Sequence, residues 1–164
     1  QYLLENLVEE EQKIVTKYQE VLRFMVLEAR KKGYTIGVDI PFWFDEIQYD
    51  NDFGQGILAE WIIEEVDEIT LMAYRTLADG DGGIIDIVSK EIKWANHLNK
   101  GVFIAVETVP LPEVHTTFYQ EGTDRMNEQL EIVNKHFQGE PSYQGIAVHH
   151  LMNWRSMKVK KIED

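Results

Sequence analysis

Four short apolar segments, each followed by a helical pattern, constrain most strongly what this chain can fold into. The segments are 34–41, 68–74, 101–108 and 145–149. Every second side chain within them is aliphatic, and alternate residues of a strand point to opposite faces, so this spacing predicts four strands. Helical spacing recurs at 1–32, 57–66, 85–98, 123–137 and in a short final helix with Trp154 and Met157. Regular alternation of strands and helices predicts a parallel sheet with right-handed crossovers.

The first helix and the segment after the first strand carry further expectations. One helical face of 1–32 collects apolar residues that we expect to be buried. These residues are Ile14, Tyr18, Leu22, Met25 and Ala29. The segment 42–56 mixes aromatic and acidic residues, and we expect it to form a loop beside the end of the first strand.

The second face of each predicted strand distinguishes two kinds of parallel sheet. Open doubly wound sheets have two large apolar faces, whereas here the second face mixes polar, aromatic and small residues. A mixed face is typical of the lumen of a (β/α)8 TIM barrel, an α/β fold of about 250 residues. We therefore expect 1–164 to be a single α/β domain, the C-terminal half of such a barrel. The alternative is a small flavodoxin-like domain, but the sequence lacks its phosphate-binding Gly-x-Gly-x-x-Gly fingerprint.

Composition excludes several classes of function. The net charge is −13, from 16 Lys and Arg against 29 Asp and Glu, and no basic stripe is present, so nucleic acid is not expected as a partner. The absence of cysteine excludes disulfides, thiolate metal sites and cysteine nucleophiles. No apolar run approaches the roughly 20 residues of a membrane span. We expect no cofactor. The sequence does not identify the compartment, and secretion or a place at the cell surface is compatible with it.

Polar side chains stand at the end of each predicted strand. In order these are Asp39, Tyr74, Glu107 and His149, all on the mixed face and all at the carboxyl end of the sheet. Two carboxylates that flank a glycosidic bond serve as acid and base, or as acid and nucleophile, and Glu107 and Asp39 are the available pair. Tyr74 would hydrogen-bond a carboxylate or a developing charge, and His149 would position a sugar hydroxyl or tune the acid. The alternative interpretation is that these residues are simply solvated strand ends.

Other residues near the strand ends are candidates for substrate binding. Trp43 and Trp154 would stack on sugar rings, unless they only pack at the rim of the core. Arg75 and His150 are the polar candidates for the same role. A metal site of His149 with Asp39 and Glu107 is a weaker hypothesis, because adjacent His149 and His150 point to opposite faces and no His-x-His or His-Glu-x-x-His spacing occurs.

Several motifs resemble a known family. Leu-Met-Ala-Tyr at 71–74 is similar to the Met-x-Tyr strand of chitinase-like glycoside hydrolases. Asp-Ile-Pro-Phe-Trp at 39–43, Val-Glu-Thr at 106–108 and Gly-Ile-Ala-Val-His-His at 145–150 resemble bacterial TIM-barrel proteins of the glycoside-hydrolase-like kind. The resemblance implies the barrel fold and a mouth that faces carbohydrate. The Asp-x-x-Asp-x-Asp-x-Glu strand of chitinases is absent, and Arg75 stands where they usually carry an acid.

The sequence therefore predicts a glycoside-hydrolase-like protein that acts on a polysaccharide or glycan by carboxylate acid/base catalysis. One alternative is a non-catalytic carbohydrate-binding or cell-surface protein with a degenerate barrel, and another is a metal-dependent hydrolase. Four strands of a barrel leave two open sheet edges, so we also expect copies of the chain to associate through these edges.

Overall fold

The computed structural model describes residues 2–157, with side chains from Glu10 onward; Gln1 and residues 158–164 of the expected domain lie outside the described residues. The elements in chain order are α1 (Tyr2–Lys31), β1 (Gly37–Pro41), the 3₁₀ helix η1 (Phe42–Glu46), β2 (Gln48–Asn51), β3 (Gly54–Ile57), α2 (Leu58–Glu65), β4 (Glu68–Met72), α3 (Ile84–Leu98), β5 (Gly101–Glu107), the 3₁₀ helix η2 (Val114–Thr116), α4 (Thr123–Phe137), β6 (Tyr143–His149) and α5 (Leu151–Ser156).

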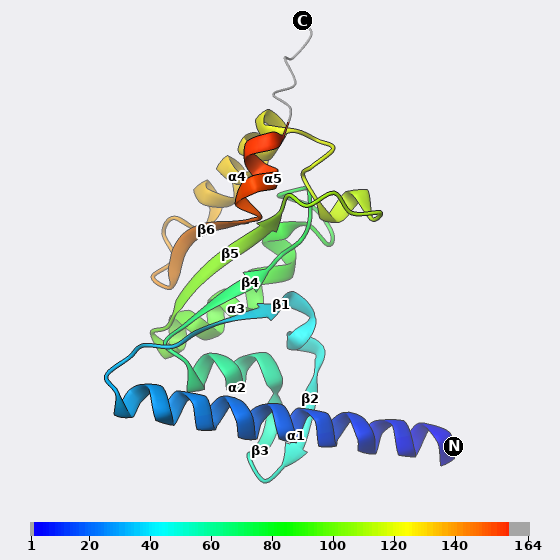
Figure 1. Ribbon diagram of the computed structural model, residues 1–164, viewed down its shortest axis with the longest axis vertical. Coiled ribbons are helices and arrows are strands. Elements are labelled where there is room, and N and C mark those ends of the chain that lie inside the picture. Colours follow the sequence, from blue (N-terminus) through cyan, green and yellow to red (C-terminus); the bar gives the residue numbers. More distant parts are fainter. Residues whose placement is uncertain (1, 158–164) are drawn as a thin grey trace, which may run out of the picture.

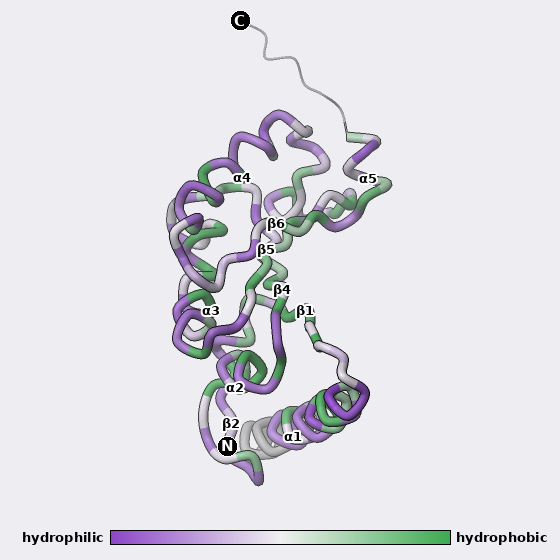
Figure 2. Tube along the Cα trace, turned by 90° about the vertical axis from the view of Figure 1, so that its left-hand side faces the viewer, coloured by the Kyte–Doolittle hydropathy of each residue, from purple (hydrophilic) through white to green (hydrophobic). Residues whose placement is uncertain are grey.

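The central sheet is parallel, as the alternation of strands and helices predicts. Its four strands lie in the order β1-β4-β5-β6, so each strand pairs with the next parallel strand along the chain (Figure 1). Helices α2, α3 and α4 lie on one side of this sheet (Figure 2). The fold is therefore mixed α/β with one helical layer, and β1 and β6 are the two edges of the sheet.

Burial along the strands confirms the predicted alternation. Ile69 and Leu71 of β4 and Ile104 of β5 are completely buried on the helix side. Thr70 and Met72, which alternate with the buried residues of β4 and point to the other face, remain partly exposed. This difference follows from the side on which α2–α4 pack, and it defines an open face of the sheet that carries the mixed residues.

The buried face of α1 agrees only in part with the predicted one. Leu22 is buried and Tyr18 packs against the core, as expected. Ile14 is 69% exposed and Met25 is 51% exposed, whereas Val15 and Val26 are buried in their place. Apolar residues occur on both sides of this helix, so the spacing alone allowed two stripes. Packing against α2 and the β2–β3 hairpin selects the stripe that also contains the buried Gln19.

The segment expected to be a loop contains an antiparallel hairpin. Strands β2 and β3 pair from Gln48 opposite Ile57 to Asn51 opposite Gly54. The turn between them is Asn51-Asp52-Phe53-Gly54, and Gly54 has a φ of 101°, which favours glycine over residues with a Cβ. An Asn/Asp/Gly turn is a recognised hairpin signal, and here it separates segments without clear alternation.

One carboxylic acid lies inside the helical layer. Glu91 of α3 is completely buried, and neither of its carboxyl oxygens has a hydrogen-bond partner in the structure. Burial raises its pKa from 4.5 to about 8. The folded protein thus holds this carboxyl protonated at neutral pH, whereas the unfolded chain releases the proton.

This difference predicts how stability depends on pH. Because the folded state retains the proton and the unfolded state loses it above pH 4.5, the free energy of unfolding should fall as pH rises from about 4.5 to about 8. The loss is on the order of 3 kcal/mol at pH 7. Glu91→Met, with similar volume and no charge, should remove this pH dependence. Urea unfolding of both proteins at pH 5 and pH 8 measures it, and equal pH slopes would show that Glu91 is not held neutral.

Candidate functional site

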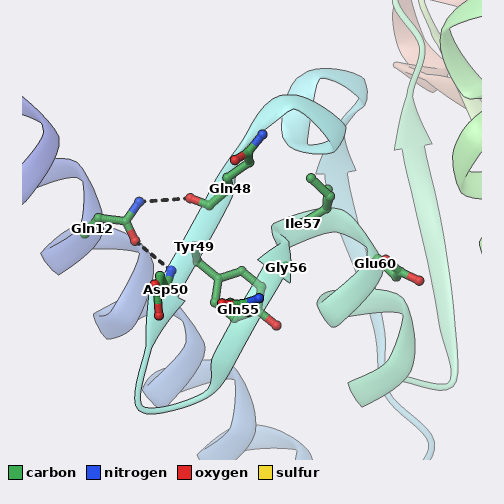
Figure 3. Close-up of a pocket in the computed structure, with 8 residues that line it drawn as sticks. All are labelled: Gln12, Gln48, Tyr49, Asp50, Gln55, Gly56, Ile57 and Glu60. Atoms are coloured by element: carbon green, nitrogen blue, oxygen red, sulfur yellow. Dashed lines mark hydrogen bonds between the residues drawn. The ribbon is translucent and has the colours of Figure 1, made fainter.

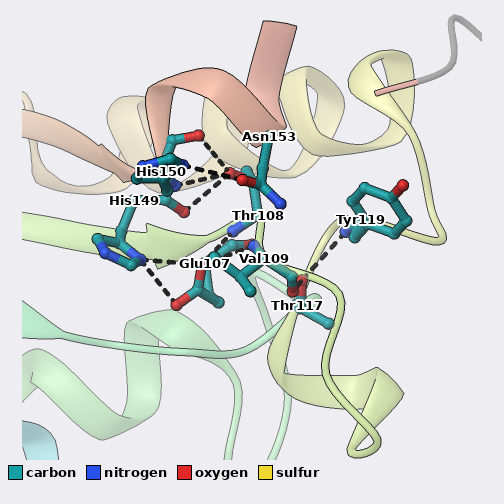
Figure 4. A network of polar contacts seen from close by, with 8 residues as sticks. All are labelled: Glu107, Thr108, Val109, Thr117, Tyr119, His149, His150 and Asn153. Carbon is teal, nitrogen blue, oxygen red and sulfur yellow. Dashed lines mark hydrogen bonds and ion pairs between the residues drawn. The ribbon is translucent and has the colours of Figure 1, made fainter. Parts of the chain in front are cut away.

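Glu107 and His149 come together at the carboxyl ends of β5 and β6. They are register partners on adjacent parallel strands, and both side chains belong to the open face. His149 Nδ1 lies 2.9 Å from Glu107 Oε2 and 3.1 Å from Oε1 (Figure 4). The sequence pattern predicted both residues at this end of the sheet, and the structure places them in direct contact.

The two partners differ sharply in exposure. Glu107 is only 5% exposed, and its Oε1 accepts hydrogen bonds of 2.7 Å from the backbone N–H groups of Thr108 and Val109. The side chain of His149 is 56% exposed, with Nδ1 facing Glu107. A buried carboxylate that accepts the Nδ1–H bond fixes the imidazole ring and leaves Nε2 toward solvent. This is the arrangement in which a histidine takes up or delivers protons.

Thr108 connects the ends of the two strands, a role that strand periodicity does not predict. Its side chain is completely buried, and its Oγ1 accepts a 2.8 Å hydrogen bond from the backbone N–H of His150. The same hydroxyl lies 2.9 Å from the carbonyl oxygen of His149 and 3.1 Å from that of His150, whose shared peptide bond is cis. Thr108 thus fixes the backbone that carries the imidazole. The hydrogen-bonding capacity of a threonine after a strand-terminal acid was its only signal.

Tyr74 lies just beyond the end of β4, because the strand predicted over 68–74 ends at Met72 in the structure. The backbone turns there, with the N–H groups of Ala73 and Arg75 donating to carbonyls two residues earlier. Burial raises the pKa of the Tyr74 phenol, and the negative charges of Glu107 and Asp39 raise it further. Tyr74 therefore keeps its proton as a hydrogen-bond donor, within electrostatic reach of both carboxylates.

Asp39 lies further back on the open face than the other three residues. It is opposite Thr70 in the register, and Thr70 is opposite Phe103, which precedes Glu107 by four residues (107 − 103). At roughly 3.3 Å per residue, this sets Asp39 back by about 13 Å along the strands. The structure therefore groups Tyr74, Glu107 and His149. Asp39 is exposed on the same face of the sheet, away from this group.

The expected substrate-binding residues occupy two different regions. Trp43 is 50% exposed in η1 and packs edge-on against Phe42, whose ring lies under the Arg75 guanidinium at 4.7 Å. These three side chains form a rim at the ends of β1 and β4. His150 turns away from Glu107 and contacts Asn153 of α5, with Nδ1 2.8 Å from Oδ1 (Figure 4).

Trp154 lies on the helix side of β6 and not beside His149. It lines a pocket with Met126 and Leu130 of α4 and with Ile146 and Val148, the β6 residues that point toward the helices. Strand alternation puts His149 on the opposite face. A shared ring-stacking role for Trp43 and Trp154 at one mouth therefore has no support from this placement.

A polar pocket of about 610 Å³ lies elsewhere, between α1, the hairpin and α2 (Figure 3). Gln12 holds its wall together, because its side-chain amide donates to the Gln48 carbonyl at 2.9 Å and accepts from the Asp50 N–H at 3.3 Å. Tyr49 is buried at its base, and burial followed by the charge of Glu64 raises the pKa of the phenol. This pocket was not predicted, and it brings together no acid–histidine pair.

The described part of the chain contains neither a cluster of metal ligands nor a membrane-spanning helix. No three His, Asp or Glu side chains among residues 10–157 gather closely enough to hold a metal ion. None of the helices within residues 2–157 is long and apolar enough to span a membrane. Comparison with known proteins found no matching family model, no matching curated protein and no matching solved structure.

The Thr108 hydroxyl can be tested without a substrate. Thr108→Val keeps the volume but leaves the N–H and the carbonyl of His150 without the hydroxyl, so we expect a loss of about 1–3 kcal/mol in the free energy of unfolding. Thr108→Ser keeps the hydroxyl and should stay much closer to the parent protein. Denaturant unfolding compares the two variants. If valine and serine are equally stable, the hydroxyl does not hold the two strand ends together.

Proposed function

We propose that this protein is a glycoside-hydrolase-like enzyme that acts on a polysaccharide or glycan by acid/base catalysis at the ends of β4, β5 and β6. One observation carries the proposal: the almost fully buried Glu107 carboxylate contacts Nδ1 of an exposed imidazole, His149, at 2.9 Å. A glycosidic bond needs a positioned proton donor at its leaving oxygen and a base for the attacking water. The pair supplies the donor, and Asp39 is the carboxylate available as the base.

In the proposed reaction, protonated His149 gives its Nε2 proton to the glycosidic oxygen as the bond from that oxygen to the anomeric carbon breaks. Glu107 stabilises the imidazolium before the transfer and keeps the ring oriented. Water adds to the anomeric carbon, and the proton that it releases passes through intervening water to the Asp39 carboxylate, which is set back along the strands. Asp39 returns its proton to solvent, and His149 regains one. Tyr74, a phenol within reach of both carboxylates, donates a hydrogen bond to the sugar or the water.

The surroundings of the pair also favour a sugar. The half-exposed indole of Trp43 stands at the rim, where an aromatic face can stack on a sugar ring. The open face of the sheet carries polar and small residues along its length, including Thr70 and Asp39, and these leave room for hydroxyl groups. This mixed face distinguishes the sheet from doubly wound sheets, which have two large apolar faces.

We further propose that the four strands are half of a (β/α)8 barrel. Three features support this: the strands follow each other in spatial order, the crossover helices lie on one side, and the polar residues end on the other side. A barrel would bring a second set of four strands to the edges of β1 and β6. The lumen would then enclose Glu107, His149 and Asp39 and shield the site from bulk solvent.

A non-catalytic carbohydrate-binding protein is the second candidate. The observation in its favour is the offset of Asp39 from Glu107 by four residues along the sheet, together with the three contacts that already occupy the Glu107 carboxylate. A degenerate site of this kind would retain the sugar-binding rim and lose turnover. The two candidates therefore differ in turnover and not in binding.

Glu107→Gln distinguishes these candidates on a broad panel of polysaccharides. The amide keeps the size of the side chain but no longer stabilises the imidazolium, so we expect hydrolysis to fall by about 10²- to 10⁴-fold with little change in sugar binding. Glu113→Gln, at an exposed acid in the following loop, is the matched control. Normal hydrolysis by Glu107→Gln would rule out the proposed mechanism, and sugar binding without any turnover by the parent protein would favour the second candidate.

Light scattering tests the barrel proposal. Two unpaired parallel edges, β1 and β6, make pairing with further strands favourable, so we expect residues 1–164 to form dimers or larger assemblies in solution. Concentration-dependent mass measured after size exclusion is the readout. A monodisperse monomer at high concentration would count against a half-barrel with open edges.

A further inference from the structure

We infer that the glycan recognised at this site is acidic, and that Arg75 binds the carboxylate of a uronic-acid-type sugar. This inference rests on the proposed carbohydrate function and adds the substrate class. The inference depends on one observation: the Arg75 guanidinium lies at the rim of the site and is held in place by uncharged partners. Its charge is therefore available to a ligand.

The structure fixes Arg75 without using its charge. Its Nη1 donates a 2.8 Å hydrogen bond to the backbone carbonyl of Tyr74, its neighbour in the chain. The guanidinium carbon lies 4.7 Å from the centre of the Phe42 ring, in a cation–π contact that crosses from the end of β4 to the end of β1. A planar group held on one face by an aromatic ring keeps its edge N–H donors for another partner.

Arg75 makes no ion pair with any residue in the described part of the chain. By contrast, Arg23 pairs with Glu65 and Arg125 pairs with Glu128. Acids outnumber bases by 29 to 16 in this sequence, so a half-buried arginine without a carboxylate partner is unexpected. Two acids at these strand ends have other partners: Glu107 faces His149, and Asp45 of η1 pairs with Lys90.

The net charge makes this cation necessary for an anionic ligand. A protein with a charge of −13 repels a polyanion at long range, so an acidic sugar needs a local positive group at the site. Guanidinium matches a carboxylate with two parallel N–H···O bonds, a geometry that a neutral sugar hydroxyl cannot reproduce. A neutral glycan would leave the Arg75 charge without a partner.

Matched glycans that differ only in charge provide the test. Polygalacturonate oligosaccharides and their fully methyl-esterified forms share the same backbone, and binding of each to the intact chain is measured by calorimetry. A wider set pairs glucuronate- and mannuronate-containing oligosaccharides with their methyl esters. We expect at least one acid form to bind about 10- to 100-fold more tightly than its ester.

Three variants assign the preference to one residue. Arg75→Gln should bind acid and ester equally, and Arg75→Lys should recover only part of the preference, since lysine lacks the bidentate geometry. Arg125→Gln removes a partly exposed cation of α4 and should keep the full preference. Circular dichroism confirms that each variant is folded.

The possible outcomes distinguish failure of the acidic-glycan inference from failure of the proposed carbohydrate function. Equal binding of acid and ester, or a preference that survives in Arg75→Gln, overturns the inference while the carbohydrate function stands. Binding to none of the glycans, acidic or neutral, contradicts the proposed function and the inference with it. A preference lost equally in Arg125→Gln would assign it to overall charge, which also overturns the role of Arg75.

Discussion

One-sided burial of the parallel sheet is the constraint on which the rest of the structure depends. The aliphatic residues of β4 and β5 are completely buried against α2–α4, so the alternating positions are directed to the opposite face. Polar groups can stand at the carboxyl ends of the strands because that face has no helical cover. The Glu107–His149 contact follows from this directionality, since register pairing on adjacent strands brings the two side chains together.

Those parts of the fold that depend on side-chain periodicity could be predicted from the sequence. The four parallel strands and the helix Thr123–Phe137 follow from apolar spacing. The buried face of α1 could not, because Ile14 and Val15 are both aliphatic and only packing decides between them. The hairpin could not be predicted either, since β2 and β3 are short polar strands whose stability depends on contacts with α1.

The site shows the same division between local pattern and three-dimensional contact. Strand phase placed Glu107 and His149 correctly on one face, but phase says nothing about position along a strand. Asp39 is therefore set back, because β1 gives way to η1 after Pro41 while β5 continues to Glu107. The placement of Trp154 depends on where α5 folds after β6. The role of Thr108 depends on the partner strand, which no single-sequence pattern identifies.

The amide of Gln12 takes the place of a missing neighbour strand. It donates to one carbonyl of β2 and accepts from an N–H two residues further on, as a peptide group of a paired strand would do. This occupies the outer side of β2, which would otherwise offer free backbone groups to another polypeptide. The outer side of β2 is thereby protected against edge-to-edge aggregation by one side chain. Strand addition is opposed there, whereas β1 and β6 of the main sheet keep edges to which a further strand can add.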